Sequence, residues 1–260
     1  MLGLTVDFPG IRQGTQLADL ASRDRELELF PVVVGALPHE FDAASYAGRL
    51  AERLPPGRRA AALVVGYCMS APIAYHLARV LGQETGTEPV AVMLDGVPHL
   101  GDAVAGTYRE LLVRYGADRT QPEVSGAELR QRPQTVLAGM AGTLREAAAR
   151  RIGAEVGEEI VVADIVEDLV GHATAWLTHL IAGHNADFPP WRGTVVMVNS
   201  RDAEHTDPWP RAGHTRTVPV DCAHDELIDH PDVVRILAAA PRIATGAAAA
   251  ASNGHHGSNG

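Results

Sequence analysis

The sequence is poor in the features that would anchor it in a membrane or cross-link it outside the cell. Only two of its 260 residues are cysteine, too few for a disulfide framework, so a reducing compartment is expected. It has no run of about 18 apolar residues that could span a bilayer. Its first ten residues lack the basic and apolar segments of a signal peptide. We therefore expect a cytoplasmic protein that binds no membrane.

Positive charge and metal-ligand motifs are also scarce. Lys and Arg total 22 against 32 for Asp and Glu, and the net charge of -10 argues against nucleic acid as a partner. The sequence has no C-x-x-C pair, no H-E-x-x-H, no P-loop and no G-x-G-x-x-G. We therefore expect no metal and no bound cofactor. With 46% apolar residues, the chain is long enough for one large α/β domain.

Apolar runs alternate with helical patterns through the first hundred residues. The expected strands are residues 2–6, 27–34, 61–65 and 89–94, and the expected helices are 15–21, 41–54 and 70–82. Two more strands are expected at 193–199 and 216–220, followed by a closing helix at 233–240. This alternation predicts a mostly parallel sheet, whose ligands lie beyond the carboxyl ends of its strands.

The strand pattern stops between residues 101 and 190. Helical patterns follow one another there, at residues 104–115, 126–132, 134–152 and 161–181. We interpret residues 101–190 as a helical lid with an apolar chamber; the alternative is a packing subdomain with no substrate role. The α/β core then comprises residues 1–100 and 191–243. The Ala-rich and then polar residues 244–260 are expected to form a disordered tail.

Residues 66–70, Gly-Tyr-Cys-Met-Ser, lie between an expected strand and an expected helix. They have the form of a nucleophile elbow, G-x-S-x-G, with Cys68 in the place of Ser and Ser70 in the place of the last Gly. Such a turn is strained, needs small residues such as Gly66, and presents its central side chain at a helix N-terminus, which favours a thiolate. The alternative is that Cys68 is a small buried apolar residue.

A thiol nucleophile needs a base, and the base needs a third group to orient it. Of the 12 histidines, His224 is the best placed, because it directly follows the last expected strand. Asp95, Asp202 and Asp207 each follow a strand whose carboxyl end lies at the same edge of the sheet. From position alone, any of the three could hold the imidazole.

The order of elements and these motifs resemble the α/β-hydrolase thioesterases that release chains from polyketide and nonribosomal peptide synthetases. The resemblance covers residues 2–240 and rests on four segments: VVGYCMSAPIAYHLARVL, AVMLDGVP, PPWRGTVVMVNSRDAEHTDPWP and VPVDCAHDELIDHPDVV. In the type I branch the triad Asp follows the strand after the elbow, which implies Asp95. In the stand-alone type II branch it follows a later strand, which would imply Asp202. We favour Asp95.

The resemblance implies an α/β-hydrolase fold and a triad of Cys68, His224 and Asp95. It also implies a substrate carried on the phosphopantetheine of an acyl carrier or peptidyl carrier protein. The backbone N–H groups of Met69 and Phe8 are expected to hold the oxyanion. An acyl group on Cys68 would remain an activated thioester, so hydrolysis, cyclisation and transfer to a small-molecule acceptor are all open.

Three other interpretations remain at this stage. The chain could be an acyltransferase or condensing enzyme that does not hydrolyse. It could be a small-ester hydrolase similar to the dienelactone hydrolases, which use Cys in a G-x-C-x-G elbow but lack a long helical lid. It could also be a non-catalytic binding protein on a hydrolase scaffold, which predicts that Cys68 forms no acyl adduct.

Overall fold

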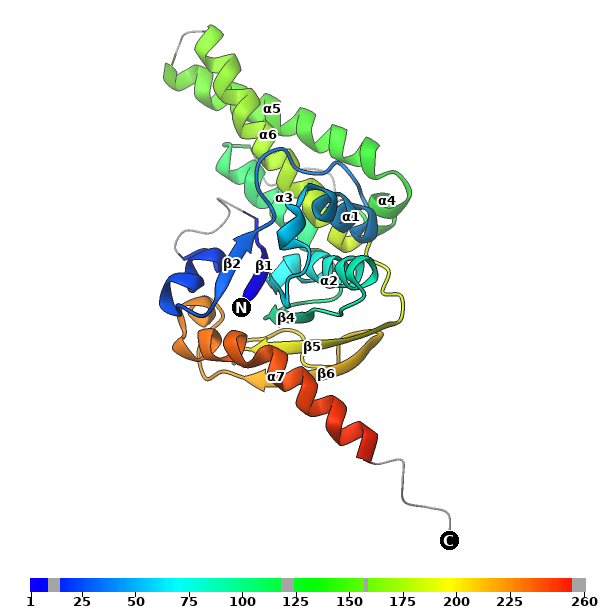
Figure 1. Ribbon diagram of the computed structural model, residues 1–260. Coiled ribbons are helices and arrows are strands. Elements are labelled where there is room, and N and C mark those ends of the chain that lie inside the picture. Colours follow the sequence, from blue (N-terminus) through cyan, green and yellow to red (C-terminus); the bar gives the residue numbers. More distant parts are fainter. Residues whose placement is uncertain (9–14, 118–123, 157–158, 254–260) are drawn as a thin grey trace. The chain divides into compact units, whose positions relative to one another are not determined.

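The strands form one six-stranded sheet in which every neighbouring pair is parallel (Figure 1). The structure, a computed structural model, describes residues 1–8, 15–117, 124–156 and 159–253. The strand order is β2-β1-β3-β4-β5-β6. The strands are β1 (Leu2–Val6), β2 (Glu28–Pro31), β3 (Leu63–Tyr67), β4 (Val90–Leu94), β5 (Trp191–Asn199) and β6 (Ala212–Pro219). The mostly parallel sheet predicted from the sequence is confirmed.

Helices and 3-10 turns connect these strands. They are η1 (Leu17–Arg23), α1 (Ala43–Arg53), η2 (Pro56–Arg58), η3 (Cys68–Ser70), α2 (Ala71–Thr85), η4 (Leu227–Asp229) and α7 (Pro231–Asn253). Two elements differ from the sequence expectation. The helix expected at residues 15–21 is a 3-10 helix, and α7 spans Pro231–Asn253, whereas the closing helix is expected at residues 233–240.

The two faces of the sheet are covered by different elements because alternate strand residues point to opposite sides. Leu63, Val65 and Tyr67 of β3 belong to a core cluster together with residues of η1 and α7. Gly66 points to the other face, where it lies against α2. β3 is buried along its whole length, which explains why it reads as a continuous apolar run.

Helix α2 packs unusually closely on the ends of β3 and β4. A Cβ atom at Gly66 would lie 2.6 Å from the Ala74 Cβ and 3.0 Å from the Ala71 Cα. A Cβ atom at Gly96, just after β4, would lie 2.7 Å from the Ala71 Cβ. Glycine is needed at both positions, because real Cβ atoms do not approach each other so closely. The start of α2, and the turn before it, are therefore held tightly against the sheet.

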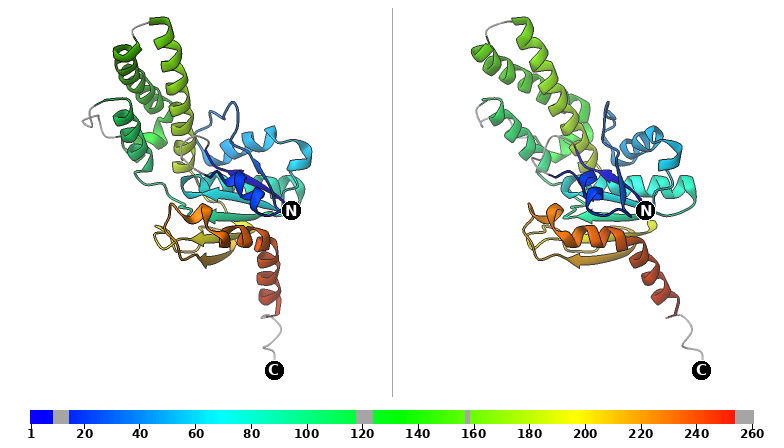
Figure 2. Two further views of the ribbon diagram at one scale, coloured as in Figure 1. Left: turned by 90° about the vertical axis from the view of Figure 1, so that its left-hand side faces the viewer. Right: turned by 60° about the vertical axis from the view of Figure 1, so that its left-hand side comes forward.

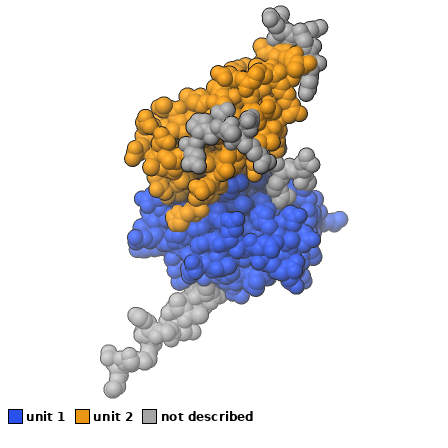
Figure 3. All heavy atoms as spheres, turned by 180° about the vertical axis from the view of Figure 1, so that it is seen from behind, with its two compact units in different colours: residues 1–36, 47–98, 187–260 blue, residues 37–46, 99–186 orange. Residues whose placement is uncertain are grey.

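The chain divides into two compact units (Figure 3). Unit 1 contains the sheet and comprises Met1–Ala36, Ala47–Pro98 and Asp187–Gly260; unit 2 comprises Leu37–Tyr46 and His99–Ala186. Unit 2 holds the helices α3 (Ala103–Arg114), α4 (Gly126–Gln131), α5 (Pro133–Val156) and α6 (Glu159–His184). Helices α5 and α6 lie side by side (Figures 1 and 2). Among the described residues, none of the helices combines the length and the apolar character needed to cross a bilayer.

The close packing at Gly66 leads to a stability prediction. We expect Gly66→Ala to lower the free energy of unfolding by about 1–3 kcal/mol, because the added methyl group would overlap α2. The matched control is Gly48→Ala in α1, where a Cβ would meet nothing within 4 Å. That change removes a helix-interior glycine and should raise the free energy of unfolding by about 0.5–1 kcal/mol. Urea unfolding followed by circular dichroism measures both, and equal stability of the two variants would contradict the prediction.

Candidate active site

The turn after β3 has the backbone of a nucleophile elbow. Cys68 has a φ of 48°, a left-handed conformation that non-glycine residues rarely adopt and that costs about 1–3 kcal/mol. The chain passes from Tyr67 at the end of β3 through η3 and directly into α2. Cys68 is a free, half-buried cysteine at this point. The strained turn predicted from the sequence is therefore present, with the thiol at its apex.

Asp95 occupies the equivalent point after β4 and is nearly fully buried, with 2% of its side chain exposed. It also has a positive φ, of 44°. Its Oδ1 accepts a hydrogen bond from the Ser200 backbone N–H at 2.7 Å, and its Oδ2 accepts one from the Ser200 hydroxyl at 2.6 Å. Burial by itself raises the pKa of Asp95, but hydrogen bonds from His224 and Ser200 outweigh it and lower this pKa below its ordinary value. The carboxylate is therefore charged.

His224 joins the other two residues. Its Nδ1 lies 2.7 Å from Asp95 Oδ2. The hydrogen bond to Asp95, together with the nearby sulfur of Cys68, raises the pKa of His224 from 6.5 to about 10, against the opposing effect of burial. The imidazole is thus held in its protonated form at neutral pH, between a carboxylate and a sulfur atom.

The other two candidate carboxylates are not next to the imidazole ring. Asp202 Oδ2 accepts a hydrogen bond from the backbone N–H of His224 at 3.2 Å, so it fixes the loop rather than the ring. Asp207 is exposed. Of the three residues that sequence position left open, the structure places Asp95 on the imidazole.

The two residues expected to hold the oxyanion lie at the same edge of the sheet. Val6 of β1 is paired in register with Gly66 of β3, and Phe8 and Cys68 each come two residues later, just beyond the ends of these strands. Met69 directly follows Cys68 in η3. Their backbone N–H groups remain the predicted oxyanion donors.

Sequence reasoning missed two side chains that contact the site, Tyr67 and Ser200. The Tyr67 hydroxyl lies 2.8 Å from Nε2 of His224, and the two rings are stacked with centroids 5.2 Å apart. Ser200 directly follows β5, so the same strand-end argument that selected Asp202 could have selected it. No sequence signal indicates that Tyr67 reaches a histidine 157 positions away.

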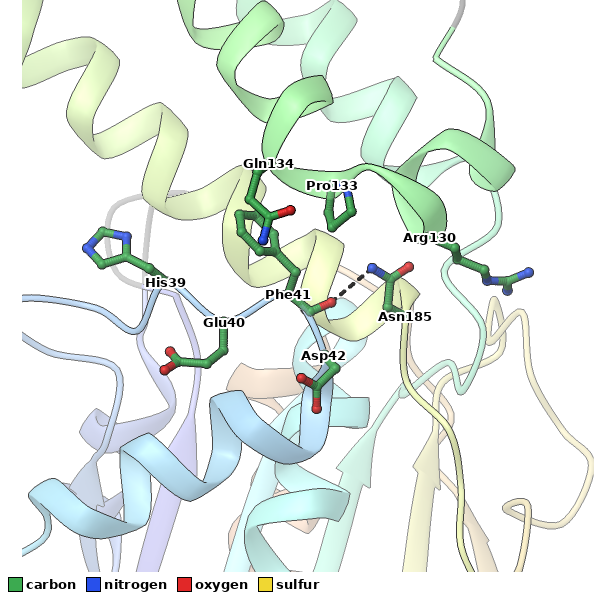
Figure 4. Close-up of a pocket in the computed structure, with 8 residues that line it drawn as sticks. All are labelled: His39, Glu40, Phe41, Asp42, Arg130, Pro133, Gln134 and Asn185. Atoms are coloured by element: carbon green, nitrogen blue, oxygen red, sulfur yellow. Dashed lines mark hydrogen bonds between the residues drawn. The ribbon is translucent and has the colours of Figure 1, made fainter.

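Unit 2 has a hollow of about 600 Å³ (Figure 4). It is lined by His39, Glu40, Phe41, Asp42, Arg130, Pro133, Gln134 and Asn185. The Asn185 amide donates to the backbone oxygens of Phe41, at 2.9 Å, and Leu129, at 3.0 Å, and so ties together three segments of unit 2. Six of these eight residues have polar or charged side chains, so this hollow differs from the apolar chamber that the composition of residues 101–190 suggests.

Comparison with known proteins finds likeness only at the level of structure. No family model and no curated protein matches the chain. AB3403, a four-domain nonribosomal peptide synthetase, has a TM-score of 0.54 and 17% identity, over 93% of this chain and 19% of that one. The Vlm2 thioesterase domain, bound with a dodecadepsipeptide, has a TM-score of 0.52 and 15% identity, over 91% of each chain. The thioesterase RedJ of prodiginine biosynthesis in Streptomyces coelicolor has a TM-score of 0.49 and 18% identity, over 93% of this chain and 84% of that one.

The parallel sheet, the elbow after β3 and the likenesses to AB3403 and to the Vlm2 thioesterase domain define the fold of the protein. It has the α/β-hydrolase fold, as the sequence predicts. At identities of 15% and 17% the likeness carries the fold alone. The chemistry must therefore be argued from the residues of the site itself.

The geometry of His224 predicts which carboxylate controls its titration. In an NMR titration of the imidazole ring, we expect Asp95→Asn to lower the pKa of His224 by roughly two units or more, from about 10 toward 6.5. Asp202→Asn is the matched control, because Asp202 accepts its hydrogen bond from the backbone N–H of His224 and not from the ring. In that variant the pKa of His224 should stay near the wild-type value. A larger fall in Asp202→Asn would show that the wrong carboxylate has been assigned.

The same raised pKa makes stability depend on pH. Because the folded state holds the His224 proton up to about pH 10 and an unfolded histidine releases it near 6.5, the contribution is fully present below pH 6.5. It is lost progressively as the pH rises through about 10. Urea midpoints measured from pH 6 to pH 10.5, taken relative to a His224→Gln variant, should therefore decline with rising pH. A difference that is flat or increases with pH would contradict the assignment.

Proposed function

We propose that this protein is a thioesterase-like enzyme that takes an acyl chain from a carrier-protein thioester onto Cys68. The chain would then leave by hydrolysis, by cyclisation or by transfer to a small-molecule acceptor, in natural-product biosynthesis. The observation that carries the proposal is the hydrogen bond from His224 to the buried carboxylate of Asp95, at the edge of the sheet where Cys68 sits on a strained elbow. The thioester substrate is suggested by the structures similar in fold, which include a thioesterase domain and a nonribosomal peptide synthetase.

In the first step Cys68 attacks the thioester and its proton is held by His224. The sulfur forms a bond to the thioester carbonyl carbon, and the backbone N–H groups of Met69 and Phe8 stabilise the oxyanion. When the oxyanion collapses, the bond to the pantetheine sulfur breaks. That leaving sulfur takes the proton from Nε2 of His224.

In the second step an acceptor attacks the acyl group on Cys68. Exchange of one thioester for another loses little free energy, so the acyl group on Cys68 stays activated. The ester formed by a serine nucleophile would be a lower-energy resting state. Water or an alcohol would give up its proton to neutral His224, and the Cys68 thiolate would leave. Asp95 keeps the ring in the orientation that both steps need.

The helical unit fits this proposal better than the small-ester alternative. Enzymes similar to dienelactone hydrolases would use the same three residues but lack a long helical lid. Helices α5 and α6 contain 24 and 26 residues, and we propose that unit 2 serves as the lid. No bound cofactor is required, because the phosphopantetheine belongs to the carrier protein.

The proposal is tested by trapping the acyl-enzyme. After incubation with an acyl-pantetheine thioester, intact-mass and peptide mass spectrometry should show an acyl adduct on Cys68. Cys68→Ala should lose the adduct and reduce release of the pantetheine thiol by at least about 100-fold. Cys222→Ala is the matched control: Cys222 is buried at 3% exposure, burial raises its thiol pKa, and its loss should leave the adduct in place.

Two results would overturn the proposal. Turnover without a modified Cys68 would remove the covalent mechanism. Absence of both adduct and turnover, with indifference to Cys68→Ala, would favour the non-catalytic binding protein.

A further inference from the structure

One hydroxyl group at the site has no place in the triad. Tyr67 is 7% exposed and directly precedes Cys68, so the packing that fixes the elbow also fixes Tyr67. Its hydroxyl makes two contacts with His224: 2.8 Å to Nε2 and 3.3 Å to the backbone oxygen. The ring of Tyr67 stacks on the imidazole with an interplanar angle of 21°. Nε2 is the nitrogen that must exchange protons with substrate, because Nδ1 is held by Asp95.

The pattern of donors and acceptors fits a protonated imidazole. In that form Nδ1–H donates to Asp95, Nε2–H donates to the Tyr67 hydroxyl oxygen, and the hydroxyl donates its own hydrogen to the His224 backbone oxygen. In a neutral ring with its hydrogen on Nδ1, the single hydroxyl hydrogen would have to serve both Nε2 and the backbone oxygen. The Tyr67 contacts are therefore best satisfied when Nε2 carries a proton.

Tyr67 gains importance once Cys68 is acylated. Within the part of the chain that the structure describes, the titratable groups that face His224 are Tyr67 of β3, Cys68 of η3, and Asp95 and Asp202, which follow β4 and β5. Acylation blocks the sulfur of Cys68, and Asp202 accepts its hydrogen bond from the backbone N–H of His224. After the ring has given its proton to the leaving thiol and regained one from solvent, Tyr67 is the side chain that remains hydrogen-bonded to Nε2.

We propose that Tyr67 is a positioning residue that holds Nε2 of His224 protonated, which speeds formation of acyl-Cys68 and slows its hydrolysis. The inference rests on the proposed function and names the chemical class of acceptor that would attack acyl-Cys68. Water and alcohols need an unprotonated Nε2 to take their proton as they attack. A neutral amine attacks first and loses its proton afterwards to solvent, so an amine is the acceptor best suited to this intermediate.

The kinetic test separates the two steps. With an acyl-pantetheine thioester, the burst of thiol release measures formation of acyl-Cys68, and the decay of the adduct mass measures its hydrolysis. For Tyr67→Phe we expect formation to slow by about tenfold and hydrolysis at pH 8 to speed up by about tenfold, the factor for one lost hydrogen bond to a charged group. Tyr75→Phe is the matched control, because it removes a buried hydroxyl that bonds the Pro189 backbone oxygen at 3.0 Å. It should match the wild type in both rates.

A second measurement needs no substrate and keeps the two proposals distinguishable. An NMR titration should show the pKa of His224 about one unit lower in Tyr67→Phe than in the wild type, and unchanged in Tyr75→Phe. If the His224 pKa does not move, or if Tyr67→Phe slows formation and hydrolysis together, the role of Tyr67 is overturned. If wild-type Cys68 is never acylated while the His224 pKa shifts as expected, the proposed function fails and the hydrogen bond from Nε2 to Tyr67 stands.

Discussion

The site depends on one buried charge, the carboxylate of Asp95. A carboxylate this deeply buried is stable only when its oxygens accept hydrogen bonds. Here the partners come from two other segments of the chain: the residue after β5 supplies two donors through Ser200, and the loop after β6 supplies the ring of His224. The carboxylate therefore ties three segments together at one edge of the sheet. It also sets the charge of the imidazole, because an anion at 2.7 Å stabilises the imidazolium form.

Backbone strain is concentrated at the same edge. Cys68 and Asp95 follow neighbouring parallel strands, and both adopt a left-handed conformation without being glycine. The close packing of α2 against Gly66 and Gly96 offers a physical reason that these conformations persist. The sheet and α2 thus act as a rigid support that presents the sulfur and the carboxylate at fixed positions. The loop that carries His224 completes the arrangement, and the carboxylate of Asp202 anchors its backbone.

Much of the fold could be predicted because its signals are local. Buried strands such as β3 and β4 are short apolar runs, and α2 shows helical periodicity directly after a strained turn. Boundaries were less accurate where tertiary contacts decide them. Strand β2 ends at Pro31, three residues before the expected end. Strand β6 begins at Ala212, four residues early, because its register starts opposite Trp191.

The sequence by itself determined which residues reach the active edge, since the carboxyl ends of parallel strands must lie together: Cys68, Asp95, Asp202 and His224 all follow from that rule. It could not decide among Asp95, Asp202 and Asp207 by position, because each comes after a strand, and only the resemblance favoured Asp95. The tertiary structure places the carboxylate of Asp95 on the imidazole of His224, and it revealed Tyr67 and Ser200. Which side chain meets which at that edge depends on loop conformation and side-chain reach, and distances of 2.6–2.8 Å between residues over 100 positions apart leave no trace in local sequence.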